Sequence, residues 1–408
     1  MAGVLDRLLD EAGVEALVIT SRSVRDPYLA PFLGGGRLGY ALLVAARGRR
    51  PLLGFLSPME RDEAARSGLD LLPPDQLDVQ RYSRDGAAPD ALWAGVLERA
   101  LQWAELSASA GPVALAGTMP AGILAGVCRR LAAVGWHFEP GEAIADRYRK
   151  VKSAAQLESI RSASEGTSAA MRRVASMLAE SAADPDGALT LGGEPLRVGT
   201  LRSAVAQTLA AHHLEQPEGN IIAPAEEGAV PHTVGTDSRQ LRAGESLVVD
   251  IFPRGEMFSD CTRTFCVGEP SPELDRGYRA VLAALEHAEG RAAPGTSGWQ
   301  LHSEVCDLFE AAGYRTSASH RGTERGYVHG LGHGVGFELH ELPSFREHAE
   351  DGEGALEVGD VLTLEPGLYE PDERWAVRLE DLYAVEGDGV RSLTPLPRHL
   401  DPRRWPPT

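Results

Sequence analysis

The sequence predicts an α+β protein made of two domains, an α/β domain over residues 1–148 and a larger domain over residues 149–408. Three observations predict this class. The chain has 408 residues, 43% of them apolar, which is enough for two domains that each bury a core. Helix and strand signals alternate up to about residue 145, whereas the later helices alternate with strand pairs that read as hairpins. Between these parts, the basic segment 147–153 leads into a long helical pattern.

The first domain is expected to be an α/β domain without a nucleotide-binding loop. Apolar spacing identifies its helices, short apolar runs identify its strands, and Ser57-Pro58 supplies a cap and a first-turn proline for one helix. No glycine-rich phosphate loop interrupts the pattern. The expected elements are a helix over 4–12, a strand over 16–19, a hairpin over 41–55, a helix from Ser57, a helix over 90–106, a strand over 113–116 and a helix over 121–134.

The second domain begins with a long amphipathic helix over 154–179. A stretch rich in glycine, proline and aspartate, 183–199, reads as a surface loop or an insertion. Helices outside a largely antiparallel sheet make this an α+β domain. Its remaining expected elements are helices over 201–214, 274–291 and 300–312, and hairpins over 246–267 and 361–385.

Charge and composition exclude several classes of partner. The chain has 40 basic and 59 acidic residues, a net charge of −19, so neither nucleic acid nor an anionic membrane is an expected partner. No apolar run approaches the roughly 18 residues of a membrane helix, and the N-terminus lacks a secretory signal, so we expect a cytoplasmic protein. The cysteines form no paired motif and are expected to be buried thiols. They are Cys128, Cys261, Cys266 and Cys306.

Four carboxylates interrupt apolar, strand-like sequence in the second domain. Asp250 ends a buried strand, and Asp260 follows on the expected returning strand. Glu365 and Glu380 repeat the arrangement on the second hairpin. Buried carboxylates are costly unless they are paired or bind a metal ion, so the four together indicate a metal site.

A glycine-rich segment between the two hairpins adds histidines to this set. His329 and His333 lie four residues apart, but the glycines around them argue against a helix, and His340 follows shortly after. Four carboxylates with one histidine suit two divalent ions, Mn²⁺ first and Co²⁺ or Zn²⁺ as alternatives. Two such ions would neutralise the carboxylates, and a hydroxide that bridges them would be a strong nucleophile.

These residues resemble the motifs of the pita-bread metallopeptidases, the family of Xaa-Pro aminopeptidase, prolidase and methionine aminopeptidase. Four blocks match in order: Val-Val-Asp250, Ser-Asp260-x-Thr-Arg-Thr-Phe, Gly-His333-Gly-Val-Gly with His340-Glu341-x-Pro, and Leu-Glu365-Pro-Gly with Val-Arg-Leu-Glu380. The resemblance implies that two metal ions bind five ligands. They are Asp250, Asp260, His333, Glu365 and Glu380. Asp260 and Glu380 would bridge the ions, and Glu365 would be the general base.

The resemblance also implies a substrate pocket and a fold. Its residues would be His232, His329, His340, Tyr369 and Arg378. Residues 149–408 would form a pita-bread catalytic domain, and residues 1–148 a creatinase-like N-terminal domain that often pairs across a two-fold axis, so we expect a homodimer. The interval from Asp250 to Asp260 is about one residue shorter than is usual in the family, which predicts a tighter hairpin.

The implied function is a metallo-aminopeptidase that acts on short peptides with a free N-terminus, preferably where proline follows the first residue. His340, Glu365 and His232 would be its catalytic residues, with His340 stabilising the tetrahedral intermediate. Alternatives are an Xaa-Pro dipeptidase and an aminopeptidase without a proline requirement. A metal-free amidinohydrolase such as creatinase and a non-catalytic binding module are further alternatives. The remaining patternless histidines are expected in solvent. They are His212, His213, His287, His302, His320 and His348.

Overall fold

The computed structural model describes residues 2–83, 87–346 and 354–406, and the chain divides into two compact units. Unit 1 covers residues 1–149 and unit 2 covers residues 150–408. Each unit has its own sheets and its own buried apolar clusters. Within the described ranges, no helix is long and apolar enough to cross a membrane.

Unit 1 contains one six-stranded sheet with the strand order β4-β3-β2-β1-β5-β6. The predicted hairpin over 41–55 is confirmed, because β2 pairs with β3 in antiparallel register. β1 is antiparallel to β2 and parallel to β5. The strands are β1 (Ala16–Ser21), β2 (Ala41–Ala46), β3 (Leu52–Phe55), β4 (Asp70–Leu72), β5 (Val113–Gly117) and β6 (Phe138–Pro140).

Helices cover both faces of this sheet. Leu17 and Ile19 pack in a cluster with residues of α1, whereas Ala16 and Val18 pack with residues of α4 and α5. This explains why β1 is buried along its whole length and begins with four consecutive apolar residues, 16–19, rather than alternating. The helix expected at Ser57 begins as a short 3₁₀ turn, Pro58–Glu60, capped by the Ser57 hydroxyl. The helices are α1 (Ala2–Ala12), α2 (Arg61–Ala65), α3 (Val79–Tyr82), α4 (Pro89–Trp103), α5 (Ala121–Ala132) and α6 (Glu142–Lys150), with a 3₁₀ turn at Ala30–Phe32.

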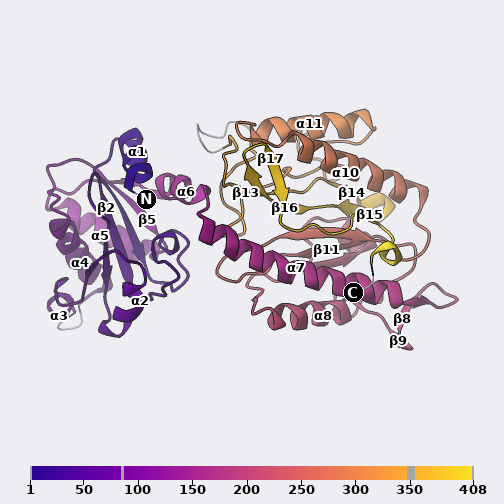
Figure 1. Cartoon of the computed structure of the whole chain (residues 1–408), viewed down its shortest axis with the longest axis horizontal. Coiled ribbons are helices and arrows are strands. Elements are labelled where there is room, and N and C mark those ends of the chain that lie inside the picture. The colour runs from indigo at the N-terminus through magenta and orange to yellow at the C-terminus, as the bar shows by residue number, and fades with distance from the viewer. Residues whose placement is uncertain (1, 84–86, 347–353, 407–408) are drawn as a thin grey trace. The chain divides into compact units, whose positions relative to one another are not determined.

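Unit 2 begins with its longest helix, α7. Ser153 caps this helix, and Gln156 completes a capping box with it. Figure 1 shows α7 and α8 along one side of the unit 2 sheets, and α10 and α11 along the other. The helices are α7 (Ala154–Glu180), α8 (Val198–Ala211), α9 (Ala225–Gly228), α10 (Pro272–Arg291) and α11 (Gly298–Ala311), with 3₁₀ turns at Pro371–Glu373 and Pro402–Arg404.

The strands of unit 2 that matter for the site form three small antiparallel sheets. β10 (Ile221–Pro224), β11 (Leu247–Ile251) and β12 (Cys261–Phe265) form the first. The predicted second hairpin consists of two nested strand pairs, β13 with β16 and β14 with β15. Each arm of the hairpin is interrupted once, at Glu365-Pro366 and at Leu379-Glu380. Proline has no N–H to continue a ladder, which accounts for the first break. The strands of this part are β13 (Val361–Leu364), β14 (Gly367–Glu370), β15 (Trp375–Arg378), β16 (Asp381–Glu386) and β17 (Gly389–Ser392).

The prediction of a surface loop over 183–199 is wrong. This stretch holds a small antiparallel sheet of β7 (Ala182–Ala183), β8 (Leu189–Leu191) and β9 (Glu194–Pro195), and α8 begins at its end. Its two buried leucines, Leu189 and Leu196, belong to the apolar cluster under α7. Isolated leucines among glycines and acidic residues carry too weak a periodic signal to predict so short a sheet.

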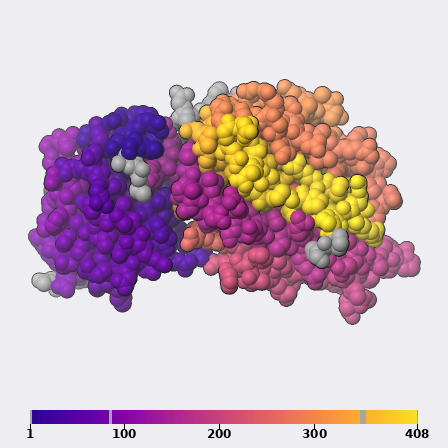
Figure 2. Space-filling model, in the orientation of Figure 1, coloured from indigo at the N-terminus to yellow at the C-terminus, as the bar shows by residue number. Residues whose placement is uncertain are grey.

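The last described residues of the chain pack on α7, the first helix of unit 2. In Figure 2 the C-terminal segment, in yellow, lies along α7, in magenta. Trp405 packs into the cluster that contains Met171 and Val174 of α7, and its ring lies 5.3 Å from that of Phe265. The C-terminal segment therefore helps to fix α7 against β12.

Candidate active site

Strand register brings the two aspartates to one face of the first sheet. Asp250 of β11 pairs with Thr262 of β12, and Asp260 lies two residues before Thr262. Because side chains alternate along a strand, these three residues share a face, and their neighbour Cys261 belongs to the opposite one. Both aspartates are buried. The short hairpin between them therefore keeps both carboxylates on the same side.

The two glutamates of the second hairpin lie where its strands are interrupted, Glu365 between β13 and β14 and Glu380 between β15 and β16. Glu380 donates its amide to Thr262 O at 3.0 Å, and its carboxylate accepts a hydrogen bond from the Thr262 hydroxyl at 2.7 Å. Glu365 donates its amide to Leu331 O at 2.7 Å, which ties it to the glycine-rich segment. Thr262 was not predicted as a site residue, although its place in the Asp260-x-Thr motif could have suggested it.

His333 lies between these carboxylates. Its Nε2 atom is 3.7 Å from Asp260 Oδ2 and 3.6 Å from Glu365 Oε1. Candidate ligand atoms of Asp260, His333 and Glu380 all lie within 4.8 Å of one another. Asp250 faces the same cluster, since its charge raises the pKa of Asp260, Glu365 and Glu380. The structure thus brings all five predicted ligands together.

In this cluster, four carboxylates face one arginine, Arg378, so negative charge is in excess. Burial, and then the charge of Asp250, raises the pKa of Glu365 to about 8 against the opposing effect of Arg378. Burial and the neighbouring carboxylates raise the pKa of Asp260 and Glu380 well above their ordinary values. Burial, and then His340, lowers the pKa of His333 to about 3, so its imidazole is neutral and able to donate a lone pair to a metal ion.

Within this cluster, two buried carboxylate oxygens are left without a hydrogen-bond partner among the described residues. They are Asp250 Oδ1 and Asp260 Oδ1. Buried polar atoms normally find partners, so these two point to a missing one. Carboxylate oxygens and a neutral imidazole are ligands for hard or borderline divalent ions. The residues present therefore fit divalent metal ions.

The glycines around His333 are there because backbone approaches them closely. A Cβ atom on Gly332 would lie 2.0 Å from Thr363 O, and one on Gly334 would lie 2.0 Å from Leu342 O. His333 itself donates its amide to the Thr363 hydroxyl at 3.2 Å. The segment is held against β13 without forming a helix, as the sequence predicts. Its glycines thus serve to bring the imidazole within reach of the carboxylates.

A hydrogen-bonded chain of side chains joins three predicted pocket residues to the carboxylates. His329 Nε2 lies 3.0 Å from the Tyr369 hydroxyl, and Arg378 donates to that hydroxyl at 2.8 Å. Arg378 also donates to Asp250 Oδ2 at 2.6 Å and to Pro231 O at 3.4 Å. Burial, and then Arg378, lowers the pKa of His329 to about 3. These residues hold a neutral imidazole beside a fixed positive charge.

The other two predicted histidines border the cluster. The ring of His340 lies 4.2 Å from that of His333, and burial lowers the pKa of His340. His232 is exposed on a turn; burial first, and then neighbouring groups that include His232, lower the pKa of both His329 and His340. It therefore lies near enough to act on both rings across the site.

One histidine expected in solvent is buried instead. His302 of α11 lies 3.2 Å from the Tyr327 hydroxyl through Nδ1 and 3.6 Å from Cys306 Sγ through Nε2. The Tyr327 ring in turn packs edge-on against His329, with 5.5 Å between ring centroids. His302 thus stands behind the site, and the expectation of a solvated position is wrong. His348 lies outside the described residues.

The cysteines form no disulfides. Cys261, Cys266 and Cys306 are buried and Cys128 is half-buried. Cys261 belongs to the apolar cluster below β12, as alternation with Asp260 predicts.

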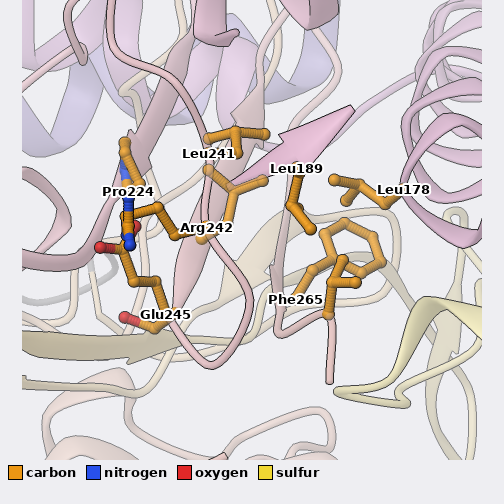
Figure 3. Close-up of a pocket in the computed structure, with 10 residues that line it drawn as sticks. Leu178, Leu189, Pro224, Leu241, Arg242, Glu245 and Phe265 are labelled. Carbon is orange, nitrogen blue, oxygen red and sulfur yellow. The ribbon is translucent and has the colours of Figure 1, made fainter. Parts of the chain in front are cut away.

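A separate small cavity lies away from these residues (Figure 3). Leu178, Leu189 and Phe265 line its apolar side, and Arg242 and Glu245 lie at its other end. Its volume of about 10 Å³ is room for about one water molecule, so it is a packing feature and not a substrate site.

Comparisons with known proteins show the family of this chain. Residues 158–387 match metallopeptidase family M24. The chain is 34% identical over 184 residues to an Xaa-Pro dipeptidase of Pyrococcus furiosus, which is 44% of this chain and 48% of that protein. It is 28% identical over 257 residues to a probable dipeptidase, PepE, of Mycobacterium tuberculosis, which is 62% of this chain and 61% of that protein. The chain thus spans about half to three fifths of the length of these curated relatives.

Solved structures share the whole architecture. A prolidase from Pyrococcus horikoshii superposes with a TM-score of 0.73 at 22% identity, covering 98% of this chain and 99% of that one. An X-Pro aminopeptidase from Thermotoga maritima superposes with a TM-score of 0.70 at 21% identity, covering 98% and 99%. The predicted fold class, a pita-bread domain after an N-terminal domain, is confirmed. This protein belongs to metallopeptidase family M24.

Proposed function

We propose that this protein is a metal-dependent exopeptidase that removes the first residue of a short peptide when proline follows it. The catalytic domain of the proposal is residues 149–408, and the metal ligands are the five predicted ones. The observation that carries the proposal is the excess of negative over positive charge in this cluster, in which the buried atoms Asp250 Oδ1 and Asp260 Oδ1 have no hydrogen-bond partner among the described residues.

The charge balance of the site supports a requirement for cations. Four carboxylates share the cluster with one fully buried arginine, Arg378, which is paired to Asp250 at 2.6 Å. Two divalent ions would hold these carboxylates ionised, polarise the scissile carbonyl and lower the pKa of a water molecule. Mn²⁺ is the first ion to test, with Co²⁺ and Zn²⁺ after it.

The side chains around the ligands would position the peptide. Glu365, whose pKa is about 8 without bound cations, would accept the proton of the attacking water. His340 would donate a hydrogen bond to the oxyanion, because it stands beside the ligand His333 and faces the same space. His232, exposed opposite these rings, would contact the substrate from the solvent side.

The half-buried imidazole of His329 would contact the proline ring. A bond to proline is a tertiary amide without an N–H donor, so a pocket for it needs surface more than a backbone acceptor. Tyr369 and Arg378 are buried, so they would act on this pocket by holding His329, whose Nε2 atom lies 3.0 Å from the Tyr369 hydroxyl.

The relatives favour dipeptides as the first substrates to test. The curated relatives named above are an Xaa-Pro dipeptidase and a probable dipeptidase, whereas one of the solved structures is an X-Pro aminopeptidase. An aminopeptidase on longer peptides is therefore the second candidate. We also propose that the protein works as a cytoplasmic homodimer, which analytical ultracentrifugation would test.

A panel of peptides separates these candidates. Chelator-treated protein would be assayed on Ala-Pro, Ala-Pro-Ala and Ala-Ala-Ala, with and without added Mn²⁺, Co²⁺ or Zn²⁺. We expect metal-dependent cleavage before proline, fastest on the dipeptide. Cleavage of all three peptides at similar rates would refute the proline requirement, and activity that survives full metal removal would refute the metal-dependent mechanism.

A further inference from the structure

The two lysines of this chain are both buried in the first residues of unit 2. Lys150 and Lys152 are the chain's entire lysine content, since the other basic residues are arginines. Their side chains are 2% and 0% exposed. Lysine is almost never fully buried unless it is paired, because its ammonium group is strongly hydrated. The partners of each buried ammonium group therefore indicate what each lysine stabilises.

Lys152 makes a fully buried ion pair with Glu341, the residue after His340. The two atoms Lys152 Nζ and Glu341 Oε1 lie 2.8 Å apart, and both side chains are 0% exposed. Lys152 Nζ also donates to Lys150 O at 2.6 Å. The second carboxylate oxygen of Glu341 accepts the amide of Glu338 at 3.2 Å. Each side chain of the ion pair is thus also hydrogen-bonded to a main-chain atom.

Glu341 closes the loop that carries both His333 and His340. Glu341 and Gly334 exchange two backbone hydrogen bonds, of 2.9 and 3.0 Å. The ion pair fills the inside of this loop, because a Cβ atom on Gly336 would lie 2.3 Å from Glu341 Oε1 and 2.8 Å from Lys152 Cε. The third glycine of the Gly-His333-Gly-Val-Gly motif is therefore required by the ion pair, not by the main chain.

We propose that Lys152 is a positioning residue for the reaction: through Glu341 it fixes the loop 333–341 and so sets the places of His333 and His340. The proposal rests on the proposed function for its activity readout. Breaking a buried pair leaves an uncompensated charge, and the loop would have to move to hydrate it. A shift of the loop would displace a metal ligand and a substrate-contacting histidine together.

Lys150 provides a matched control from the same segment. Its Nζ lies 2.7 Å from Glu357 Oε1 and 2.9 Å from Asp360 Oδ2, and it donates to Ala355 O at 2.9 Å. These partners lie in the segment before β13 and not in the histidine loop. Removing the Lys150 ammonium also breaks a buried ion-pair network, so it reproduces the structural damage without touching Glu341.

The experiment compares Lys152→Met with Lys150→Met in the full chain. Methionine keeps the length and volume of the lysine stem and removes the charge. For each variant we would measure kcat and KM on Ala-Pro with Mn²⁺, Mn²⁺ affinity by isothermal titration calorimetry, and unfolding by urea. We expect Lys152→Met to lower kcat and Mn²⁺ affinity about 10- to 100-fold, the range for residues that orient metal ligands, with KM within threefold. Lys150→Met should leave kcat and Mn²⁺ affinity within about twofold while lowering the urea midpoint.

Two further variants keep the test decisive. Glu341→Gln preserves every heavy atom of the loop and weakens only the charge-assisted contact, so it carries the test if Lys152→Met does not fold. We expect it to lower kcat and Mn²⁺ affinity at least threefold. The double variant Lys152→Met/Glu341→Gln removes both charges, and positioning predicts that kcat stays low. Recovery of kcat in the double variant would overturn the proposal, because an unpaired charge would then explain the whole effect.

The metal readout separates this proposal from the proposed function. If the wild-type protein cleaves no Xaa-Pro peptide, the proposed function fails, while Mn²⁺ affinity still reports whether Lys152 positions His333. Equal Mn²⁺ affinity in folded Lys152→Met and Lys150→Met would overturn the positioning role whatever the activity.

Discussion

The opposite faces of β12 and β16 carry two buried charge clusters that differ in how they are neutralised. On one face, Asp260 and Glu380 have no cation of their own, and one oxygen of Asp260 has no partner among the described residues. On the other face, Arg263 donates to Asp381 at 2.6 Å, and Arg398 lies 2.7 Å from the same carboxylate. We call these the site face and the brace face.

The brace face is complete within the protein. Arg263 donates to the carbonyls of Pro397, Thr262 and Glu380 as well as to Asp381, and Asp381 also accepts from the Thr394 hydroxyl at 3.1 Å. The adjacent residues Glu380 and Asp381 thus differ: the carboxylate of Asp381 is paired with two arginines, and that of Glu380 is not. The difference teaches that burial of charge alone does not mark a catalytic site, whereas burial without internal compensation does.

The largest effect should come from breaking the site face. Glu380→Ala or Asp260→Ala removes a proposed ligand, and peptide cleavage should fall at least about a thousandfold, because bound ions supply several kcal/mol of transition-state stabilisation. The same variants should stabilise the metal-free protein, since a repelling carboxylate is gone. Steady-state kinetics and urea unfolding in chelator would measure both. A fully active variant would sink the assignment of that ligand.

Breaking the brace face should instead cost stability. Arg263→Met leaves Asp381 with one arginine and removes the donor of several hydrogen bonds. The free energy of unfolding should therefore drop by about 3–5 kcal/mol. The folded fraction should still bind metal ions in the wild-type ratio, which elemental analysis of the purified variant would report. Loss of metal with unchanged stability would mean that the two faces are not distinct.

The site face should make the stability of the metal-free protein depend on pH. The pKa of Glu365 is raised from 4.5 to about 8, so above pH 4.5 the folded state holds a proton that the unfolded state has released. Stability of the metal-free protein should therefore fall as pH rises from about 4.5 to 8, and added Mn²⁺ should remove that fall. Urea unfolding at several pH values, with and without Mn²⁺, checks this. Stability that rises with pH in chelator would contradict it.

The smallest effect concerns the link between Arg378 and His329. Tyr369→Phe removes the hydroxyl that bonds both and leaves the ring in place. The lost hydrogen bonds are one with His329 and one charge-assisted bond from Arg378, together worth about 1–2 kcal/mol, so kcat/KM on Ala-Pro should fall about 5- to 30-fold with metal content unchanged. A loss as large as that of Glu380→Ala would place Tyr369 among the groups that hold the metal ions.

The sequence predicts the site face better than the rest of the molecule. Each carboxylate there is a charged residue within apolar, strand-like sequence, which is visible without knowing its partners, although only Asp250 lies inside a strand of the structure. Strand alternation likewise predicts that Asp381 points away from Glu380. The role of Lys152 was not predicted, because its partner Glu341 is remote in the chain. His302 was misplaced for the same reason, since only the fold brings it to Tyr327.

In the fold, elements with strong local signals could be predicted from the sequence and strand pairing could not. Long helices such as α7 and α10 follow from sustained apolar spacing and clear caps at Ser153 and Ser271. The nested pairing of β13 with β16 and of β14 with β15 does not, because strands of four to six residues carry little information about their partners.

The central claim is that the site face is completed by divalent ions and the brace face is not. Its most direct test is the number of divalent ions bound per chain, measured by calorimetric titration of Mn²⁺ into chelator-treated wild-type protein and into Asp260→Ala, with Ala-Pro cleavage followed on the same samples. The account predicts two ions per wild-type chain, fewer in the variant, and cleavage that rises with occupancy. A wild-type protein that binds no divalent ion, or that cleaves the dipeptide equally well without one, would contradict it.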